Sequence, residues 1–420
     1  MSIFKKAAKD ASKTTGNLVG NMASVNAQNS TNAAVDGMDL FRWKMGTPII
    51  QNGHFDQQKG NLFEYIEAAK FNADAAGKGM SARAVVTDVY DQGAAADILI
   101  KEGGKVQKEV QAKFVKSSNK DVENSAARSV FDQAGGQKGH WGKYKGMDRL
   151  IRKDEHYNAE GSMLDEAKKL AKSRAESGSI HAEDFKDVHE HLTDELHYGD
   201  ASSGGTTFEE VQMAYESPEK YAKAFERKAV KAEMKCTAAN MAKASFVTTG
   251  ILSGVTNMFE VFQDKKELAE ALHDVGADAI KGAARGGATG VVSTAIRYKG
   301  IKAGSVLLSD SVAATVMAGG IIDGGVALYS YARGEIDEQQ LKEQLVDTTA
   351  KAATTIYFTK AVGAIMGSAV NTALIAGVFR AGGDTKFGLI CDTIDMWVYA
   401  VPLGFFAAFV LKLPVLWVYF

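Results

Sequence analysis

Three short runs of apolar residues follow one another between residues 84 and 114. The first two runs, Ala84–Tyr90 and Asp97–Ile100, are rich in apolar side chains. In the third run, from residue 106 to residue 114, apolar and polar residues alternate, as they do in a strand that is buried on one face. The apolar face of this strand comprises Val106, Val110, Ala112 and Phe114, and its polar face comprises Glu109, Gln111 and Lys113. The pattern predicts a small sheet with polar groups along one side.

The segments next to these runs predict a hairpin and a helix. The sequence Glu102-Gly-Gly-Lys105 is typical of a tight turn, so the second and third strands should be antiparallel and bring Asp97 back towards Gln111. Upstream of the strands, apolar residues recur at helical spacing, and Glu64 and Glu67 lie near one another on that helix. Either glutamate is a candidate to place a second carboxylate beside Asp97.

Residues 60–118 resemble the motif of the PD-(D/E)xK nuclease superfamily. The resemblance lies in the order of a helical glutamate (Glu64), an aspartate (Asp97) and a lysine (Lys113) two positions after the amide of Gln111. The resemblance implies a restriction-endonuclease-like domain that hydrolyses phosphodiester bonds of DNA or RNA with Mg²⁺ as its cofactor. In that pattern Asp97, Gln111 and Glu64 would hold the metal through oxygen atoms, which hard divalent cations prefer. Lys113 would position the attacking water and offset charge on the phosphoryl oxygens.

Gln111 stands where this superfamily usually has an acid. One negative charge fewer weakens metal binding, and Glu109, on the same strand face, is a candidate to compensate. The fragment Asp184-Phe-Lys186 also fits the motif, but it lies in a helical pattern where the geometry is wrong. The alternative to an active enzyme is a relative that binds nucleic acid without cleaving it.

A basic and aromatic segment follows the motif. We expect a helix from Asp121 to Ala134, ended by two glycines. Lysines then alternate with aromatic rings, a pattern that suits a phosphate backbone and unstacked bases. The candidate nucleic-acid contacts are Lys138, Trp141, Lys143, Tyr144 and Lys145. The competing interpretation is the solvated start of a charged helix that buries its tryptophan.

The middle of the chain predicts charged helices. His189 and His191 fall on different faces of one helix and have no cysteine or carboxylate spacing to complete a metal site, so a solvated helical face is expected. The polar loop Gly199–Thr207 then separates two helical blocks, with Thr206 or Thr207 as the N-cap of the second. A break between two helices is expected near Pro218.

Glycines dominate the next region. Gly282, Gly286 and Gly290 recur every four residues, and similar pairs occur on either side of them. Small residues at this spacing let helix backbones approach closely, both in membranes and in tight soluble bundles. Charged residues interrupt each segment, so we expect a helical domain over residues 238–367 that is soluble or only conditionally membrane-active.

The carboxyl-terminal end has a different character. The run Phe379-Arg-Ala-Gly-Gly-Asp-Thr385 and the residues after it are similar to a late segment of multidrug and toxic compound extrusion (MATE) transporters, across residues 369–420. A fragment of this size does not imply transport. After Met396 the only charge is Lys412, and the uncharged stretch with its flanks approaches the length of a bilayer span. We therefore expect a C-terminal transmembrane helix that contacts the membrane through residues 385–420.

Composition adds limits to this picture. The chain has 420 residues, enough for two or three domains, and a net charge of −2, so any attraction for nucleic acid must be local. Its two cysteines lie far apart, which argues against a disulfide framework and suits a reducing compartment. The first residues lack the apolar core of a signal peptide. We therefore expect the protein at the cytoplasmic face of a membrane.

The predicted fold class is α+β. A small mixed sheet with flanking helices precedes an all-α, glycine-rich helical domain and a C-terminal transmembrane helix. The expected segments are a flexible arm (1–36), a nuclease-like domain (37–160), a charged helical region (161–237), the glycine-rich domain (238–367) and the MATE-like segment (368–420). The leading hypothesis is a membrane-associated Mg²⁺-dependent nuclease. The alternatives are a membrane protein with a non-catalytic N-terminal binding module, and a glycine-zipper protein that acts on membranes.

Overall fold

The computed structural model describes residues 14–91, 94–114, 143–153, 163–262 and 266–366. The chain divides into two compact units. The sheet unit is Val25–Glu233, and the helical unit consists of Met1–Ser24 and Met234–Phe420. The division falls inside one long helix, α9 (Pro218–Phe262).

The sheet unit has the small mixed sheet that the sequence predicts. Its five strands lie side by side in chain order, and β1, β2 and β3 are antiparallel, whereas β4 is parallel to β3 and β5 is parallel to β4. The strands are β1 (Arg83–Val86), β2 (Ile98–Glu102), β3 (Lys105–Lys113), β4 (Asp148–Ile151) and β5 (Leu192–Thr193). Gly103 and Gly104 both have positive φ, 57° and 79°, which the tight turn between β2 and β3 requires. The predicted hairpin is confirmed.

The alternation predicted for the third strand is wrong at its first residue. Ile100 pairs with Lys108, but Lys101 pairs with Val106, so Gln107 is an extra residue on β3. Such a bulge turns the preceding side chains to the other side of the sheet. Val106 is therefore 46% exposed instead of sharing the buried face of Val110 and Ala112.

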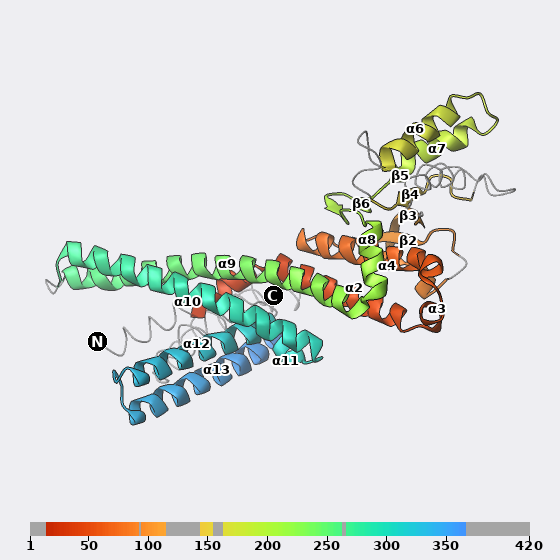
Figure 1. Ribbon diagram of the computed structural model, residues 1–420. Helices are drawn as coiled ribbons and strands as arrows, with labels where there is room; N and C mark the ends of the chain where they lie inside the picture. The colour runs from red at the N-terminus through yellow and green to blue at the C-terminus, as the bar shows by residue number, and fades with distance from the viewer. Residues whose placement is uncertain (1–13, 92–93, 115–142, 154–162, 263–265, 367–420) are drawn as a thin grey trace, which may run out of the picture. The chain divides into compact units, whose positions relative to one another are not determined.

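Helices cover both faces of the sheet. α4 (Phe55–Gly77) packs on one face, where Leu62 and Phe63 join Ile98, Val110 and Leu150 in the larger core. α2 (Val25–Met45), α3 (Pro48–Gln51), α8 (Phe208–Glu216) and the start of α9 complete this layer. Figure 1 shows α6 (Met163–Ala175) and α7 (Ala182–His191) beside β4 and β5. A second core there gathers Ile151, Ala167, Ala171, Phe185, Val188 and Leu192.

Two predictions about helix ends in the sheet unit are confirmed. Thr207 is the N-cap of α8, and its side chain accepts a hydrogen bond from the Glu210 amide at 3.2 Å. The break near Pro218 separates α8 from α9. A two-stranded hairpin, β6 (His197–Tyr198) and β7 (Ala201–Ser202), precedes α8.

The part of the predicted arm (residues 1–36) that the structure describes is helical. Residues 14–22 form a helix of the helical unit, and α2 begins at Val25. Leu18 is buried in the first helix, and Ala34 and Val35 are buried in the second. The low hydrophobicity of the segment does not prevent packing, because small residues allow close contact. A Cβ on Gly20 would lie 2.3 Å from the Met241 backbone.

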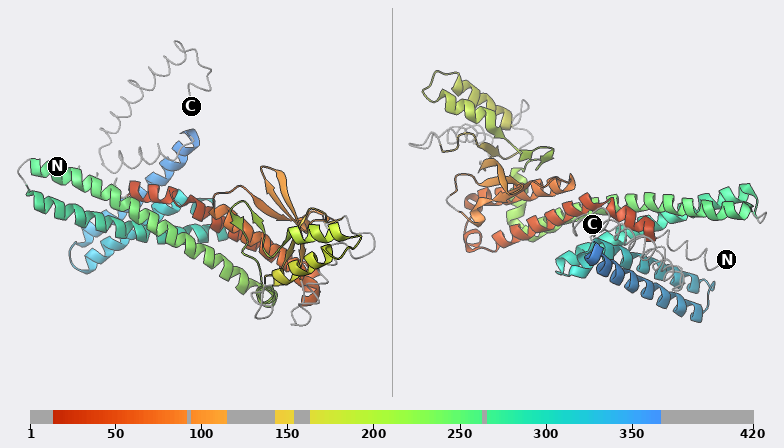
Figure 2. Two further views of the ribbon diagram at one scale, coloured as in Figure 1. Left: turned by 90° about the horizontal axis from the view of Figure 1, so that it is seen from above. Right: turned by 180° about the vertical axis from the view of Figure 1, so that it is seen from behind.

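The helical unit is an array of antiparallel helices. After α9 come α10 (Leu268–Lys302), α11 (Val306–Ser309), α12 (Ser311–Ala332) and α13 (Glu338–Met366). Both views in Figure 2 show α9 and α10 side by side and α12 beside α13. A Cβ on Gly286 would lie 2.5 Å from the Met241 carbonyl oxygen, and one on Gly290 would lie 2.7 Å from Ala238. The predicted close approach through glycines is confirmed between α9 and α10.

One helix of the described chain is long and apolar enough to cross a membrane by length and composition, over Ser311–Tyr331 of α12. One third of this stretch is buried inside the structure. The helix predicted at Asp121–Ala134 and the MATE-like segment with its expected transmembrane helix lie outside the described residues.

Candidate functional site

Asp97 stands directly before β2 and faces β3. Its backbone amide donates to the Val110 carbonyl at 2.8 Å, which extends the strand pairing by one residue. Its Oδ2 accepts hydrogen bonds from the Ala112 amide, at 2.8 Å, and from Gln111 Nε2. No described residue donates a hydrogen bond to Oδ1 of Asp97. The hairpin thus brings Asp97 and Gln111 into direct contact, with one carboxylate oxygen left open.

Glu64 and Lys113 share the electrostatic surroundings of Asp97. Burial raises the pKa of Glu64 well above its usual value, and the charge of Asp97 raises it further, whereas Lys113 lowers it. Lys113, at the end of β3, is half-buried and also acts on Asp97. Within the described chain, Glu64 has no hydrogen bond or ion pair. The charges of two carboxylates and one ammonium therefore act on one another near the start of β2 and the end of β3.

The predicted nucleic-acid segment reaches this site in part. Burial raises the pKa of Asp97, and the charges of Lys113 and Lys143 oppose that rise. Lys143 is exposed, and its ammonium lies 5.2 Å from the centre of the Tyr144 ring. Lys145 is exposed on the same turn. The other two predicted contacts, Lys138 and Trp141, lie outside the described residues.

Gln111 is buried between β2 and β4. It pairs with Asp97 on one side, and across the parallel β3–β4 ladder it lies opposite Arg149. Arg149 is fully buried and donates to Asp187 on α7 at 2.6 Å, which anchors β4 to that helix. The basic run around Arg149 suggests nucleic-acid contact from sequence alone, but this arginine is structural.

The donors around Asp97 fit a hard divalent cation. Glu64 and Asp97 offer carboxylate oxygens, and Gln111 offers an amide oxygen, which is the ligand chemistry of Mg²⁺. Neither carboxylate forms an ion pair with a described residue. The amide of Gln111 presents its nitrogen to Asp97, so it must turn over to serve as a ligand, which its two-fold terminal torsion allows. Within the described residues, no group of three or more His, Cys, Asp and Glu side chains is arranged to hold a metal ion.

Sequence reasoning missed three residues beside Glu64. Asp88 follows β1 and raises the pKa of both Glu64 and Asp97 by its charge. It binds Lys44 of α2 and Tyr65 of α4. Asp88 falls inside the predicted run Ala84–Tyr90, and a charged residue that interrupts an apolar run is the signal that could have pointed to it. Lys44 carries no such signal, because nothing local shows that it is buried.

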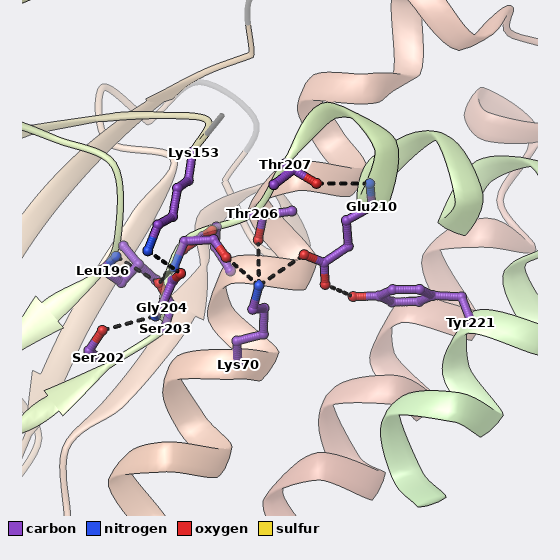
Figure 3. A network of polar contacts seen from close by, with 12 residues as sticks. Lys70, Lys153, Leu196, Ser202, Ser203, Gly204, Thr206, Thr207, Glu210 and Tyr221 are labelled. Carbon is purple, nitrogen blue, oxygen red and sulfur yellow. Dashed lines mark hydrogen bonds and ion pairs between the residues drawn. The ribbon is translucent and has the colours of Figure 1, made fainter. Parts of the chain in front are cut away.

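A second polar cluster, which contains Lys70, joins α4 to the loop before α8 (Figure 3). Glu67, fully buried, accepts a hydrogen bond from the Ser203 hydroxyl, which in turn accepts from the Leu196 amide at 2.9 Å. Burial raises the pKa of Glu67 to about 7, although the Ser203 and Thr206 hydroxyls oppose the rise. The other carboxylate oxygen of Glu67, Oε1, is buried and has no hydrogen-bond partner among the described residues.

Lys70 extends this cluster towards α8 and α9. Its ammonium donates to Glu210 at 3.0 Å, to Thr206 at 3.3 Å and to the Gly205 carbonyl. Glu210 also accepts from the Tyr221 hydroxyl at 2.7 Å. These bonds connect the loop before α8 and the start of α9 to α4. The cluster around Lys70 therefore has a structural role.

Comparisons of the chain with protein-family models, with curated proteins and with solved structures find no match.

Proposed function

We propose that the sheet unit is a Mg²⁺-dependent phosphodiesterase of the PD-(D/E)xK type, acting on DNA or RNA. The observation that carries the proposal is the contact between Asp97 and Gln111, with Glu64 and Lys113 within electrostatic range of Asp97. The order of elements adds support. A helix, three antiparallel strands and a fourth strand parallel to the third make up the arrangement that the restriction-endonuclease-like fold places around such a site.

Each residue has a distinct role in the proposed reaction. Glu64 and Asp97 supply carboxylate oxygens to the cation, and Gln111 supplies its amide oxygen. Bound Mg²⁺ would lower the pKa of its water and neutralise phosphoryl oxygens. Lys113 orients the attacking water and offsets negative charge that develops on the phosphate. The Ala112 amide holds the Asp97 carboxylate in place from the backbone, so this position is fixed before any substrate arrives.

The basic turn next to the site supplies the contact with the substrate backbone. Lys143 and Lys145 are exposed, so both ammonium groups can approach phosphates, and Lys143 is within electrostatic range of Asp97. Tyr144 is half-buried and offers a ring on which an unpaired base can stack.

The test is cleavage of plasmid DNA and of a structured RNA by the full chain, with Mg²⁺ or with a chelator. Asp97→Asn and Lys113→Met keep the shape of the side chains and should abolish cleavage. Asp56→Asn, an exposed acid on α4, and Lys105→Met, an exposed lysine on β3, are matched controls that should cleave like the wild type. Cleavage that persists in chelator, or in Asp97→Asn, would refute the proposal.

The amide orientation of Gln111 favours one alternative within the same site. With its nitrogen on Asp97, Gln111 stabilises the carboxylate without a metal. A protein of this kind would bind nucleic acid through Lys143 and Lys145 and would not cut it. Salt-dependent binding without Mg²⁺-dependent cleavage is the result that favours this alternative.

A second candidate function concerns the helical unit. We propose that α12 contacts a lipid bilayer. Its large apolar side chains face outward, with Ile321 and Val326 each 59% exposed, while small residues such as Ala314 and Ala318 are buried. The charge of Asp323 is paired with Arg285 of α10 at 2.6 Å. This inside-out distribution is typical of helices that face lipid. The expected membrane contact through residues 385–420 and the cytoplasmic location are part of the same proposal.

Vesicle co-sedimentation of the full chain tests the lipid proposal. Ile321→Lys and Val326→Lys should reduce binding to anionic vesicles. Val346→Lys changes an equally exposed apolar residue of α13 and should have little effect. Equal binding by all three variants would remove α12 from the proposed contact.

A further inference from the structure

Three residues from three elements meet beside Glu64. Lys44 is the penultimate residue of α2, Asp88 lies in the 3-10 turn η1 (Thr87–Val89) after β1, and Tyr65 follows Glu64 on α4. Lys44 Nζ forms an ion pair with Asp88 Oδ2, and the Tyr65 hydroxyl donates to Asp88 Oδ1 at 2.6 Å. Donors thus occupy both carboxylate oxygens of Asp88, so this acid is not an open metal ligand.

The ammonium of Lys44 is almost enclosed. Its side chain is 7% exposed, and Nζ lies 5.5 Å from the centre of the buried Tyr65 ring. A buried ammonium requires an anion as a partner, because leaving it unpaired costs several kcal/mol. Two anions are within electrostatic range of one another here, Asp88 and Glu64, and the charges of both Asp88 and Lys44 act on Glu64. In the structure Asp88 takes the ammonium.

Which carboxylate Lys44 pairs with determines whether the charge of Glu64 is left unpaired. If Lys44 were paired with Glu64, the carboxylate would be neutralised and turned away from Asp97. If Asp88 had no partner, a third uncompensated anion would lie beside Glu64 and Asp97. The Lys44–Asp88 pair avoids both arrangements, and the Tyr65 hydroxyl fixes the Asp88 carboxylate from the second oxygen.

We propose that Lys44, Asp88 and Tyr65 are positioning residues that keep the Glu64 carboxylate free for a divalent cation. The inference rests on the proposed metal-dependent function and names the residues that prepare the site. None of the three touches the cation or the substrate. Residues behind metal ligands typically change metal affinity about 10- to 100-fold when they are replaced.

A double-mutant cycle tests the inference. Asp88→Asn releases the ammonium of Lys44, which then pairs with Glu64. The Mn²⁺ concentration that half-saturates cleavage should rise about 10- to 100-fold, while the rate at saturating Mn²⁺ is retained. The double variant Lys44→Met/Asp88→Asn removes the competing ammonium as well, so the half-saturating concentration should return close to the wild-type value. Tyr65→Phe removes only one donor and should give a smaller rise than Asp88→Asn.

The rescue separates positioning from a purely structural role. The double variant loses more contacts than Asp88→Asn, so a structural role predicts an equal or larger defect, and that outcome would overturn the inference. Asp56→Asn, with the same charge change on the helix that carries Glu64, should leave the half-saturating concentration unchanged. An unaltered half-saturating concentration in Asp88→Asn, with an active wild type, refutes positioning but not the proposed function. A wild type that neither binds Mn²⁺ nor cleaves refutes both.

Discussion

Glu64 and Glu67 lie three residues apart on α4, and burial raises the pKa of both, yet their surroundings differ. Glu67 accepts a hydrogen bond from Ser203 on one oxygen, has no hydrogen-bond partner among the described residues on the other, and stands next to the ion pair of Lys70 and Glu210. Glu64 has no hydrogen bond or ion pair with a described residue, and its strongest charged neighbour is another acid, Asp97. Neighbouring positions on one helix therefore carry one carboxylate with a hydrogen-bond donor and one without.

The difference shows how a functional acid can be told from a structural one. A buried charge normally gains partners that offset its desolvation. Glu67 gains one such partner, the Ser203 hydroxyl from the loop before α8. Glu64 instead shares its surroundings with a like charge, an arrangement that costs free energy unless a cation is shared between them. The comparison assigns Glu67 to stability and Glu64 to chemistry, and the following predictions test that assignment.

The largest expected effect is on cleavage. Glu64→Gln removes a metal-binding charge and should lower the Mg²⁺-dependent cleavage rate about 10³-fold. Glu67→Gln keeps the shape of the side chain, and Glu67 is not a proposed metal ligand. The cleavage rate of this variant should therefore stay near the wild-type value. Single-turnover cleavage of the same substrate measures both variants. Equal losses of cleavage rate in Glu64→Gln and Glu67→Gln would contradict the assignment of Glu64 to chemistry and Glu67 to stability.

The next effect is on the pH dependence of stability. The pKa of Glu67 is about 7 in the folded protein, above its ordinary value of 4.5. Because the folded state holds this proton more tightly than the unfolded state, stability falls as pH rises through this interval. The loss is about 3 kcal/mol. Glu67→Gln has no proton to lose, so the free energy of unfolding of the wild type minus that of the variant should fall by this amount between pH 4.5 and pH 7. Parallel curves from denaturant titrations at several pH values would contradict the assignment.

Lys70→Met should come next in size. It removes the ammonium that joins Glu210, Thr206 and the Gly205 carbonyl, and it leaves the Glu210 carboxylate half-buried beside Tyr221. We expect a loss of about 2 kcal/mol of stability, measured by chemical denaturation. The half-saturating Mg²⁺ concentration should not change. A change in metal dependence without a loss of stability would show that the cluster around Lys70 belongs to the active site.

The smallest expected effect is on stability, from the N-cap of α8, the helix that carries Glu210. Thr207→Ala removes the N-cap acceptor for the Glu210 amide and should cost about 1 kcal/mol. Thr207→Ser keeps the hydroxyl and should lie within a few tenths of a kcal/mol of the wild type. Thermal unfolding of both variants distinguishes a cap from a residue with no structural role.

Local patterns were enough to predict part of this structure. The hairpin, the contact between Asp97 and Gln111 and the helix that carries Glu64 follow from alternation, turn glycines and helical spacing. The bulge at Gln107 was not predictable, because nothing in the alternation marks the extra residue. The sequence left open which glutamate faces Asp97. The answer depends on a loop more than 130 residues later in the chain, where Ser203 binds Glu67.

The residues behind Glu64 escaped prediction for the same physical reason. Lys44 and Asp88 are 44 residues apart and pair only once α2, α4 and β1 have packed. A lysine near a helix end ordinarily predicts a solvated side chain, and only the folded core shows it to be enclosed. The glycine spacing predicted the close packing of α9 and α10 correctly, because a residue without a side chain at a regular spacing directly indicates where two helix backbones can approach.

Calorimetric titration of the full chain with Mn²⁺ tests the central claim most directly. The account predicts a single binding event in the wild type and in Glu67→Gln, and its loss in Asp97→Asn and Glu64→Gln. Mn²⁺ binding that survives in Asp97→Asn and Glu64→Gln, or that disappears only in Glu67→Gln, would contradict it.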